Sequence, residues 1–282
     1  MILEGKVAIV TGSGRGIGRS IALKMAQEGA KVVINRGRAD EVVEEIRAAG
    51  GIAVSNMDSV AEMDSASRIV QTALDRFGRL DIVVNNAGNL RDRLLPDMSE
   101  EDWDEVMAVH LKGSFCMTKL AAALFCDQRS GRIINTSSPS GLVGNRGQAN
   151  YGAAKTGIAA FTRAVALELA PYNVTCNALL PRARTQMQGG NPASADLPEP
   201  DELAPFAAYL ASDYAASVTG QALRVVGGLV AVYSYPQPLR VLEKCTSWTV
   251  EELVQLFPQT LGVEPRIGAP AARAQQATPP GE

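Results

Sequence analysis

A glycine-rich segment near the start of the chain constrains the fold more than any other part of the sequence. Residues 7–10 form the continuous apolar run Val-Ala-Ile-Val, which is typical of a strand buried on both faces. The octet TGSGRGIG at residues 11–18 follows at once and leads into a predicted helix over residues 18–29. Glycine permits close backbone approach, and the free amides of a helix N-terminus attract anions. A strand, a glycine loop and a helix in this order predict a site for a dinucleotide pyrophosphate, with a tight turn that holds no ligand as the plainer alternative.

The same alternation of short apolar runs and amphipathic stretches continues to about residue 230. Further strands are predicted over residues 31–35, 52–56, 80–85, 132–137, 174–179 and 222–226, and further helices over residues 41–49, 65–77, 99–124, 151–170 and 205–211. Strand runs such as residues 82–84 and 133–134 are apolar without alternation, as expected when helices cover both faces of a sheet. The predicted fold class is α/β, with a single doubly wound parallel sheet that is Rossmann-like and flanked by helices.

Residues 1–230 are therefore predicted to form one dinucleotide-binding and catalytic domain. Residues 231–262 are predicted to form a C-terminal extension with a short helix, because Thr249 and Glu252 make the capping-box pattern T-x-x-E. Residues 263–282 are rich in Gly, Pro, Ala and Gln and are expected to be a disordered tail. The stretch 186–200 is predicted to be a mobile lid over a site, with a plain surface linker as the alternative.

The charge balance excludes several classes of function. The chain has 27 basic and 30 acidic residues, a formal net charge of −3, and so lacks the basic excess that a nucleic-acid surface needs. No apolar run approaches the roughly 18 residues of a membrane span, and the first residues lack the pattern of a secretory signal. The four cysteines are far apart with no CxxC pair, which argues against a metal site or a disulfide framework. The chain is expected to be cytoplasmic, with no membrane or nucleic-acid partner and no metal.

The end of the second predicted strand indicates which dinucleotide binds. NAD-binding folds usually place an acidic residue there to accept from the ribose hydroxyls, whereas this chain has Asn35 and Arg36. Together with Arg15 in the glycine loop, Arg36 gives two guanidiniums that suit a 2′-phosphate. NADP(H) is therefore favoured, and NAD(H) beside a merely solvated Arg36 is the alternative. Asp58, after the third strand, is expected to accept from the adenine amino group or to be a helix N-cap.

A second group of residues suits proton transfer. Tyr151 and Lys155 lie four residues apart at the start of a predicted helix, which places them on one face. An unperturbed tyrosine titrates near ~10, and a neighbouring ammonium together with an oxidised nicotinamide is expected to lower that pKa. Ser138, at the end of the preceding strand, can donate a hydrogen bond to a substrate oxygen on which charge develops. These residues predict interconversion of a ketone and a secondary alcohol, with hydride transfer at the nicotinamide and proton transfer through Tyr151.

These features, together with the segment Asn-Asn-Ala-Gly at residues 85–88, resemble the motifs of the short-chain dehydrogenase/reductase family from residue 3 to about residue 228. The resemblance implies that residues 86–88 line the adenine and ribose side of the cofactor, and that Lys155 also bonds the nicotinamide ribose. It further implies a homodimer or homotetramer that packs the helices of residues 99–124 and 151–170. The predicted cofactor-binding residues are Gly12, Ser13, Arg15, Gly16, Ile17, Gly18, Arg36, Asp58, Ser59, Asn86, Ala87, Gly88, Tyr151, Lys155, Pro181 and Thr185.

Two departures from the family pattern bear on mechanism and substrate. Where the family often has an asparagine that supports a water relay to the lysine, this chain has His110, its only histidine. His110 is predicted either to hold such a water or to be a half-buried helix residue with a satisfied hydrogen bond. The family's Pro-Gly after the sixth strand is Pro181-Arg182 here. The segments around His110 and Tyr151 resemble the dehydrogenase unit of multifunctional enzyme type 2, whose bacterial relatives act on 3-hydroxyacyl-CoA or steroid alcohols and which generally prefers NAD.

The leading interpretation is an NADP(H)-dependent oxidoreductase with a 3-oxoacyl thioester as substrate, in keeping with a resemblance to 3-oxoacyl thioester reductases. An NAD-dependent 3-hydroxyacyl-CoA or hydroxysteroid dehydrogenase is the alternative within the family. A non-catalytic nucleotide-binding sensor or scaffold is the alternative outside it, but a sensor needs no proton donor. The predicted catalytic residues are Ser138, Tyr151, Lys155 and His110. Arginines in two loops beside the site can meet the phosphates of coenzyme A or the phosphopantetheine arm of a carrier protein: Arg91, Arg93, Arg182 and Arg184.

Overall fold

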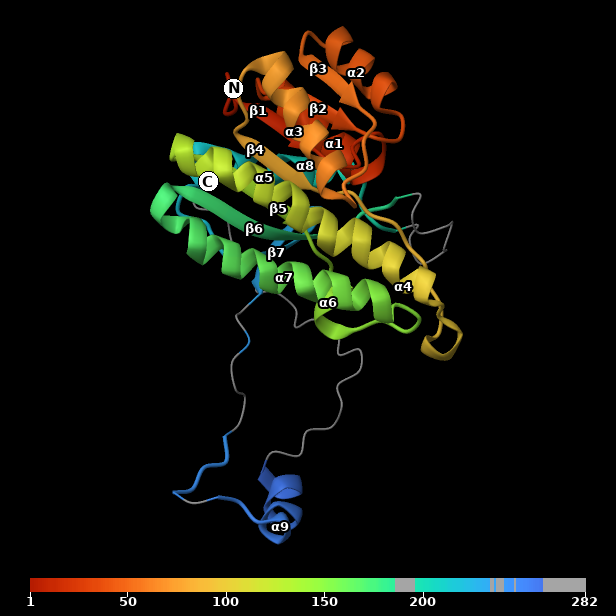
Figure 1. Ribbon diagram of the computed structural model, residues 1–282, viewed down its shortest axis with the longest axis vertical. Helices are drawn as coiled ribbons and strands as arrows, with labels where there is room; N and C mark the ends of the chain where they lie inside the picture. Colours follow the sequence, from red (N-terminus) through yellow and green to blue (C-terminus); the bar gives the residue numbers. More distant parts are fainter. Residues whose placement is uncertain (186–195, 234–235, 237–240, 246, 261–282) are drawn as a thin grey trace, which may run out of the picture. The chain divides into compact units, whose positions relative to one another are not determined.

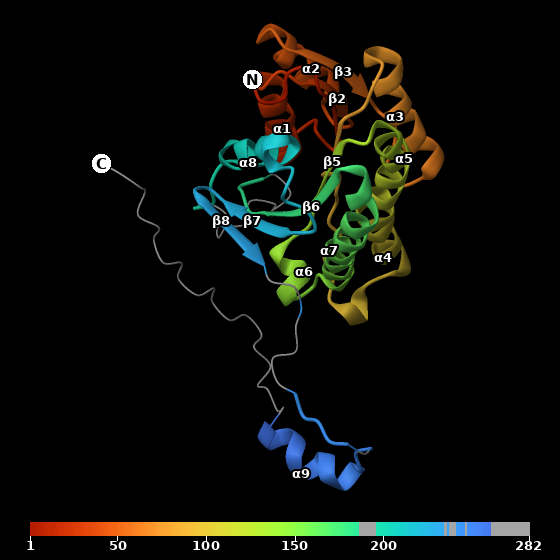
Figure 2. The same ribbon diagram turned by 90° about the vertical axis from the view of Figure 1, so that its left-hand side faces the viewer.

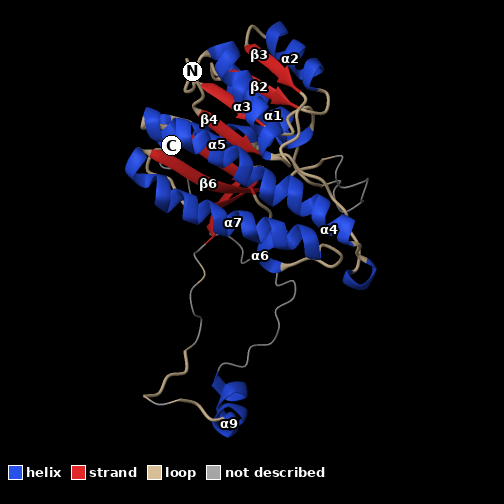
Figure 3. Cartoon of the chain, viewed as in Figure 1, coloured by secondary structure: helices blue, strands red, loops and turns tan. Residues whose placement is uncertain are grey.

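Eight strands form one sheet in the order β3-β2-β1-β4-β5-β6-β7-β8 in the computed structural model (Figure 3). The structure describes residues 1–185, 196–233, 236, 241–245 and 247–260. The predicted tail at residues 263–282 and most of the predicted lid, residues 186–195, lie outside the described residues. The strands are β1 (Val7–Val10), β2 (Lys31–Asn35), β3 (Ile52–Asn56), β4 (Ile82–Asn85), β5 (Gly131–Thr136), β6 (Val174–Pro181), β7 (Ala222–Val226) and β8 (Leu229–Tyr233).

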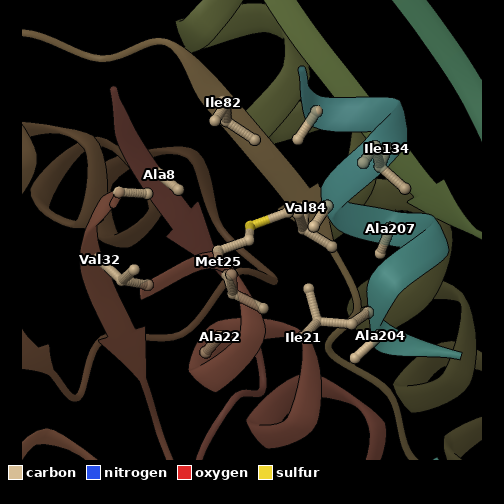
Figure 4. Packing of buried hydrophobic residues seen from close by; sticks show 14 of the residues in the cluster. Ala8, Ile21, Ala22, Met25, Val32, Ile82, Val84, Ile134, Ala204 and Ala207 are labelled. Atoms are coloured by element: carbon tan, nitrogen blue, oxygen red, sulfur yellow. The ribbon is translucent and has the colours of Figure 1, made fainter. Parts of the chain in front are cut away.

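Helices cover both faces of the sheet, as the apolar strand runs predict (Figures 1 and 2). Ala8 and Val10 of β1 pack with α1 and α8 on one face, and Val7 and Ile9 pack with α3 and α5 on the other. Figure 4 shows the first core, in which the small Ala204 and Ala207 of α8 let Ile21 of α1 approach. The helices are α1 (Gly16–Gln27), α2 (Ala39–Ala48), α3 (Met63–Phe77), α4 (Glu100–Met107), α5 (Gly113–Gln128), α6 (Pro139–Val143), α7 (Ala149–Leu169), α8 (Ala204–Ala211) and α9 (Val250–Thr260).

The predicted Rossmann-like α/β fold is confirmed, with one correction at the edge of the sheet. β1 to β7 are parallel, but β8 returns antiparallel to β7, with Val226 opposite Leu229. The residues between them are Gly227 and Gly228, and Gly227 has φ 52, so a two-glycine turn closes a hairpin. The predicted boundary at residue 230 therefore falls inside β8. The short helix α6 was also missed, because five residues carry too little periodicity to predict one.

The strand order reverses between β1 and β4, and this reversal positions the site. β1 pairs with β2 on one side and with β4 on the other. The connection after β1 therefore runs toward one edge of the sheet, and the connection after β4 runs toward the other edge. Such a switch point opens a crevice beyond the carboxyl ends of the strands. The glycine loop follows β1 into this crevice, and the segment Asn86–Gly88 follows β4 into it.

The chain divides into a compact unit, Met1–Ser234, and a second unit, Tyr235–Glu282. In the second unit the predicted capping box is confirmed at the start of α9. Glu252 N–H donates to Thr249 Oγ1 (3.2 Å), and Thr249 N–H donates to the Glu252 carboxylate (2.8 Å). Among the helices of the described residues, none combines the length and the apolar composition required to cross a bilayer.

Phe125 of α5 provides a test of the core between the sheet and the α3–α5 layer. Its side chain is fully buried, and a Cβ at Gly131 of β5 would lie 2.2 Å from its ring. Phe125→Ala should lower the free energy of unfolding by about 3–5 kcal/mol because it leaves a cavity in a close-packed layer. Met57→Ala, at a side chain 58% exposed, should change it by less than about 0.5 kcal/mol. Urea unfolding of both variants gives the comparison, and equal losses would contradict this packing.

Candidate active site

A cavity of about 1290 Å³ opens at the switch point and runs from the glycine loop to the start of α7. All four predicted catalytic residues line this cavity: His110, Ser138, Tyr151 and Lys155. The predicted cofactor-binding residues also line it, with the exception of Ser13 and Asp58. The structure therefore brings together predicted residues that are as far apart in the sequence as Gly12 and Thr185.

The glycine loop is closed against the segment that follows β4. Thr11 Oγ1 accepts from the backbone N–H groups of Asn86 (2.9 Å) and Ala87 (3.0 Å), and the Asn86 amide donates to the Thr11 carbonyl (3.0 Å). A Cβ at Gly12 would lie 2.7 Å from Ala87 Cα, and one at Gly18 would lie 2.4 Å from Asn86 Nδ2. Glycine is required at both positions because the two backbones approach so closely. The N-terminal turn of α1 borders the cavity here, which is the cradle that a pyrophosphate fits.

Three guanidiniums border the same end of the cavity. Arg15 and Arg36, the pair noted in the sequence, are joined there by Arg38. Arg36 has φ 61, a left-handed conformation that non-glycine residues seldom adopt, and its N–H donates to the Asn56 carbonyl (2.9 Å). A Cβ at Gly14 would lie 2.3 Å from the Arg36 carbonyl oxygen and from Arg38 N, so the two loops pack backbone to backbone. This packing holds the arginine loop beside the phosphate cradle.

Ser13 and Asp58 stand behind the cavity wall, which differs from their predicted positions. Ser13 is fully buried, and its hydroxyl donates to the Val10 carbonyl (2.6 Å), so it braces the turn. The Asp58 carboxylate accepts from Arg68 Nε (2.7 Å) and from Asn56 Nδ2 (3.0 Å). Each carboxylate oxygen of Asp58 therefore already accepts one hydrogen bond from the protein, and its predicted role toward adenine stays a prediction. Ser59, the next residue, does line the cavity.

Tyr151 and Ser138 meet at the centre of the site. A hydrogen bond joins their hydroxyl groups and favours the phenolate of Tyr151. Lys155 lies one turn further along α7, fully buried, with its Nζ 5.5 Å from the centre of the Tyr151 ring. Its ammonium donates to the Thr136 carbonyl (2.6 Å) at the end of β5. The i,i+4 spacing thus places both side chains on the cavity face of the helix.

Burial changes the expected titration of this pair. The sequence analysis expects the pKa of Tyr151 to be lowered by Lys155, but burial of the phenol raises it, and the Ser138 hydrogen bond opposes that rise only in part. The carboxylate of Asp92 raises it further. Burial also lowers the pKa of Lys155 to about 7, which weakens the help that its charge gives to the phenolate of Tyr151.

His110 lies between the segment that follows β4 and the ring of Tyr151. The residue is buried, within the π-helical turn Ala108–Lys112 between α4 and α5, and its ring stands edge-on to Tyr151 with 5.2 Å between centres. Its Nε2 lies 2.8 Å from the Asn89 carbonyl, while Nδ1 is buried without a partner among the described residues. A Cβ at Gly88 would lie 2.4 Å from the imidazole Cε1. The contact with Gly88 is one that the sequence could not show.

Two buried or half-buried polar residues near Tyr151 escaped the sequence analysis. Asn150 is fully buried and donates to the carbonyls of Arg91 (3.0 Å) and Asp102 (2.9 Å), while its Oδ1 accepts from Tyr151 N–H (2.7 Å). It thereby ties the start of α7 to the loop after β4 and to α4. Gln148 lines the cavity one turn before Tyr151. The only sequence signal for either residue is its closeness to Tyr151.

The arginines proposed to meet a coenzyme A or carrier-protein phosphate are less available than expected. Arg182 lines the cavity. The other three are in ion pairs with carboxylates: Arg91 with Glu105, Arg93 with Asp102, and Arg184 with Glu199. Such exposed pairs are weak, so they reduce but do not cancel the attraction for a phosphate.

The fold and the cavity are those of a dinucleotide-dependent oxidoreductase, with a glycine loop at one end of the cavity and Ser138, Tyr151 and Lys155 at the other. The family model for short chain dehydrogenases matches residues 6–194. This chain belongs to that family, which uses NAD(P)(H), as the sequence predicts.

Known proteins similar to this chain agree with that assignment. The 3-oxoacyl-[acyl-carrier-protein] reductase of Synechocystis sp. is 44% identical over 242 residues, covering 81% of this chain and 98% of that protein. The peroxisomal multifunctional enzyme type 2 of Drosophila melanogaster is 47% identical over 221 residues, covering 73% of this chain but 36% of that longer protein. The crystal structure of a short chain dehydrogenase from Mycobacterium avium superposes with a TM-score of 0.86 at 40% identity, covering 98% of this chain and 100% of that one.

His110 allows a test through the pH dependence of stability. Burial, aided by the charge of Lys155, lowers its pKa to about 3, whereas an unfolded histidine titrates near ~6.5. Below pH ~6.5 the unfolded chain therefore binds a proton that the folded chain does not, and the folded state loses up to about 1.4 kcal/mol per pH unit. His110→Asn removes this loss, so the free energy of unfolding of the wild type should fall relative to the variant between pH 7 and pH 5. Parallel curves in urea unfolding would contradict the neutral, buried imidazole.

Proposed function

We propose that this protein is an NADP(H)-dependent reductase of 3-oxoacyl thioesters, which interconverts the 3-oxo group and a secondary alcohol. The observation that carries the proposal is a single cavity with the Ser138–Tyr151 hydroxyl pair at one end and three guanidiniums at the other. Similarity to a 3-oxoacyl-[acyl-carrier-protein] reductase supports the choice of substrate.

The cradle at the glycine loop fits the cofactor. Gly12 and Gly18 leave space that a Cβ would fill, and the first turn of α1 offers its unpaired amides to a pyrophosphate. Arg15, Arg36 and Arg38 supply charge-assisted donors for a 2′-phosphate on the adenosine ribose. The bound nicotinamide would supply the hydride for reduction of the carbonyl carbon.

The chain's own residues would move the proton. The Tyr151 hydroxyl donates its proton to the carbonyl oxygen as negative charge develops there, and Ser138 donates a hydrogen bond to the same oxygen. The raised pKa of Tyr151 keeps the phenol protonated at neutral pH, which is the form that a reductase needs. After Tyr151 has given up its proton, Lys155 lies beside the ring and stabilises the negative charge of the phenolate.

We further propose that the chain associates with itself through α5 and α7, the helices that the family resemblance points to. Both helices expose large apolar side chains that a monomer would leave in water, among them Phe115 (42% exposed) and Leu167 (80% exposed). The carrier protein or coenzyme A of the substrate is proposed to approach on the side of Arg182, which lines the cavity.

The cofactor preference can be tested at Arg36. The wild type should bind NADPH about tenfold more tightly than NADH, because a 2′-phosphate gains charge-assisted bonds that a hydroxyl does not. Arg36→Asp should reverse this order, since a carboxylate repels the phosphate and accepts from the ribose hydroxyls. The control variant Arg47→Asp makes the same change of charge on α2, at a residue that does not line the cavity. It should leave the preference for NADPH over NADH unchanged. Fluorescence titration measures the affinities for NADPH and NADH. Equal affinities in the wild type would contradict the role of these arginines in cofactor preference.

The proton-transfer role can be tested at Tyr151. Tyr151→Phe keeps the ring against His110 and removes only the hydroxyl, so turnover of a 3-oxoacyl thioester should fall by at least about 100-fold. Cofactor binding should persist, as judged by the thermal shift that NADPH produces. Retained turnover would place the acid elsewhere, and a variant that no longer binds NADPH would assign the hydroxyl to the binding of the cofactor.

A further inference from the structure

The amide of Gln148 is held in one orientation at the cavity wall. Its Nε2 donates to the Asp92 carboxylate (2.9 Å), and its Oε1 accepts from Asn145 Nδ2 (3.0 Å). An ionised carboxylate accepts hydrogen bonds but cannot donate, so Asp92 fixes which end of the amide carries the nitrogen. Both partners line the same cavity.

The backbone holds this arrangement independently of the side chains. Arg93 N–H donates to the Gly147 carbonyl (2.9 Å), and a short parallel bridge pairs Arg93 with Gln148. The loop that carries Asp92 is therefore joined to the loop that carries Gln148. Asn150 adds a third link between the same two segments through the Arg91 carbonyl (3.0 Å). These links between the two loops fix the position of the Gln148 amide in the absence of substrate.

One hydrogen of this amide remains available. A glutamine nitrogen carries two donor hydrogens, and in the part of the chain that the structure describes only the bond to Asp92 uses one of them. Gln148 is the N-cap of α7, three residues before Tyr151, and both residues line the cavity. A hydrogen-bond donor therefore lies at the wall of the same cavity as the group that meets the reacting carbonyl.

We propose that Gln148 is a recognition residue for the second carbonyl of the substrate, with Asp92 as its positioning residue. This inference rests on the proposed function. The free Nε2–H donates to the thioester carbonyl of a 3-oxoacyl substrate, while Tyr151 and Ser138 hold the 3-oxo group. A simple ketone offers no acceptor at this position, so the pair distinguishes a β-dicarbonyl compound from a monoketone. A site whose polar groups are built to bond a substrate group discriminates strongly against an analogue that lacks it.

The experiment compares two substrates of equal length: a 3-oxoacyl thioester, and a ketone with a methylene group in place of the thioester carbonyl. Gln148→Leu should lower kcat/KM for the thioester at least about tenfold and for the plain ketone less than about twofold. Asp92→Ala should give a smaller loss, again confined to the thioester, because the amide can then rotate. The control variant Asp97→Asn changes a residue of the same loop that does not line the cavity. It should change kcat/KM for neither substrate.

The outcomes separate this inference from the proposed function. A wild type that reduces the plain ketone and not the thioester would overturn the proposed substrate class, and the recognition role with it. A wild type that prefers the thioester, and keeps that preference in Gln148→Leu, would overturn the role of Gln148 alone. An equal loss on both substrates would assign Gln148 a structural role in holding the start of α7.

Discussion

The site depends on the close approach of two backbone segments at the carboxyl ends of β1 and β4. Gly12 touches Ala87, Gly18 touches Asn86, and the contacts leave no room for a Cβ. The same β4 segment continues to Gly88, against which the imidazole of His110 packs. A single line of contacts therefore runs from the phosphate cradle through His110 to the ring of Tyr151.

Burial is the second organising influence, and it acts on all three titratable side chains at once. It raises the pKa of Tyr151 and lowers the pKa of Lys155 and His110, so each group is pushed toward its neutral form. Neutral groups cost less to bury than charged ones, and hydrogen bonds made in a buried site are stronger than in water. Charged side chains line other parts of the cavity, as the arginines beside the glycine loop and as Asp92 beside Gln148.

The parts of the fold that the sequence predicted well are those with long or repeated local signals. Each of the seven parallel strands carries a short run of apolar residues, and the predicted capping box at Thr249 is present. β8 could not be predicted from the sequence. Its five apolar residues follow a glycine pair, and such a pair is equally compatible with the end of a domain and with a hairpin turn. The surroundings of Asp58 could not be predicted for a different reason. Its carboxylate accepts a hydrogen bond from Arg68, a partner from α3 that sequence spacing does not reveal.

The sequence by itself determined the fold class, the position of the phosphate cradle, and the membership of Ser138, Tyr151 and Lys155 in one site. Each of these depends on residues close together in the chain or on the alternation of strands and helices, which local physics fixes. Only the tertiary structure decided the direction of the tyrosine's titration, the packing of His110 on Gly88, and the orientation of the Gln148 amide. These follow from desolvation and from contacts between segments that are distant in the chain. Their energies are set by what surrounds a side chain in space and not by its neighbours in sequence.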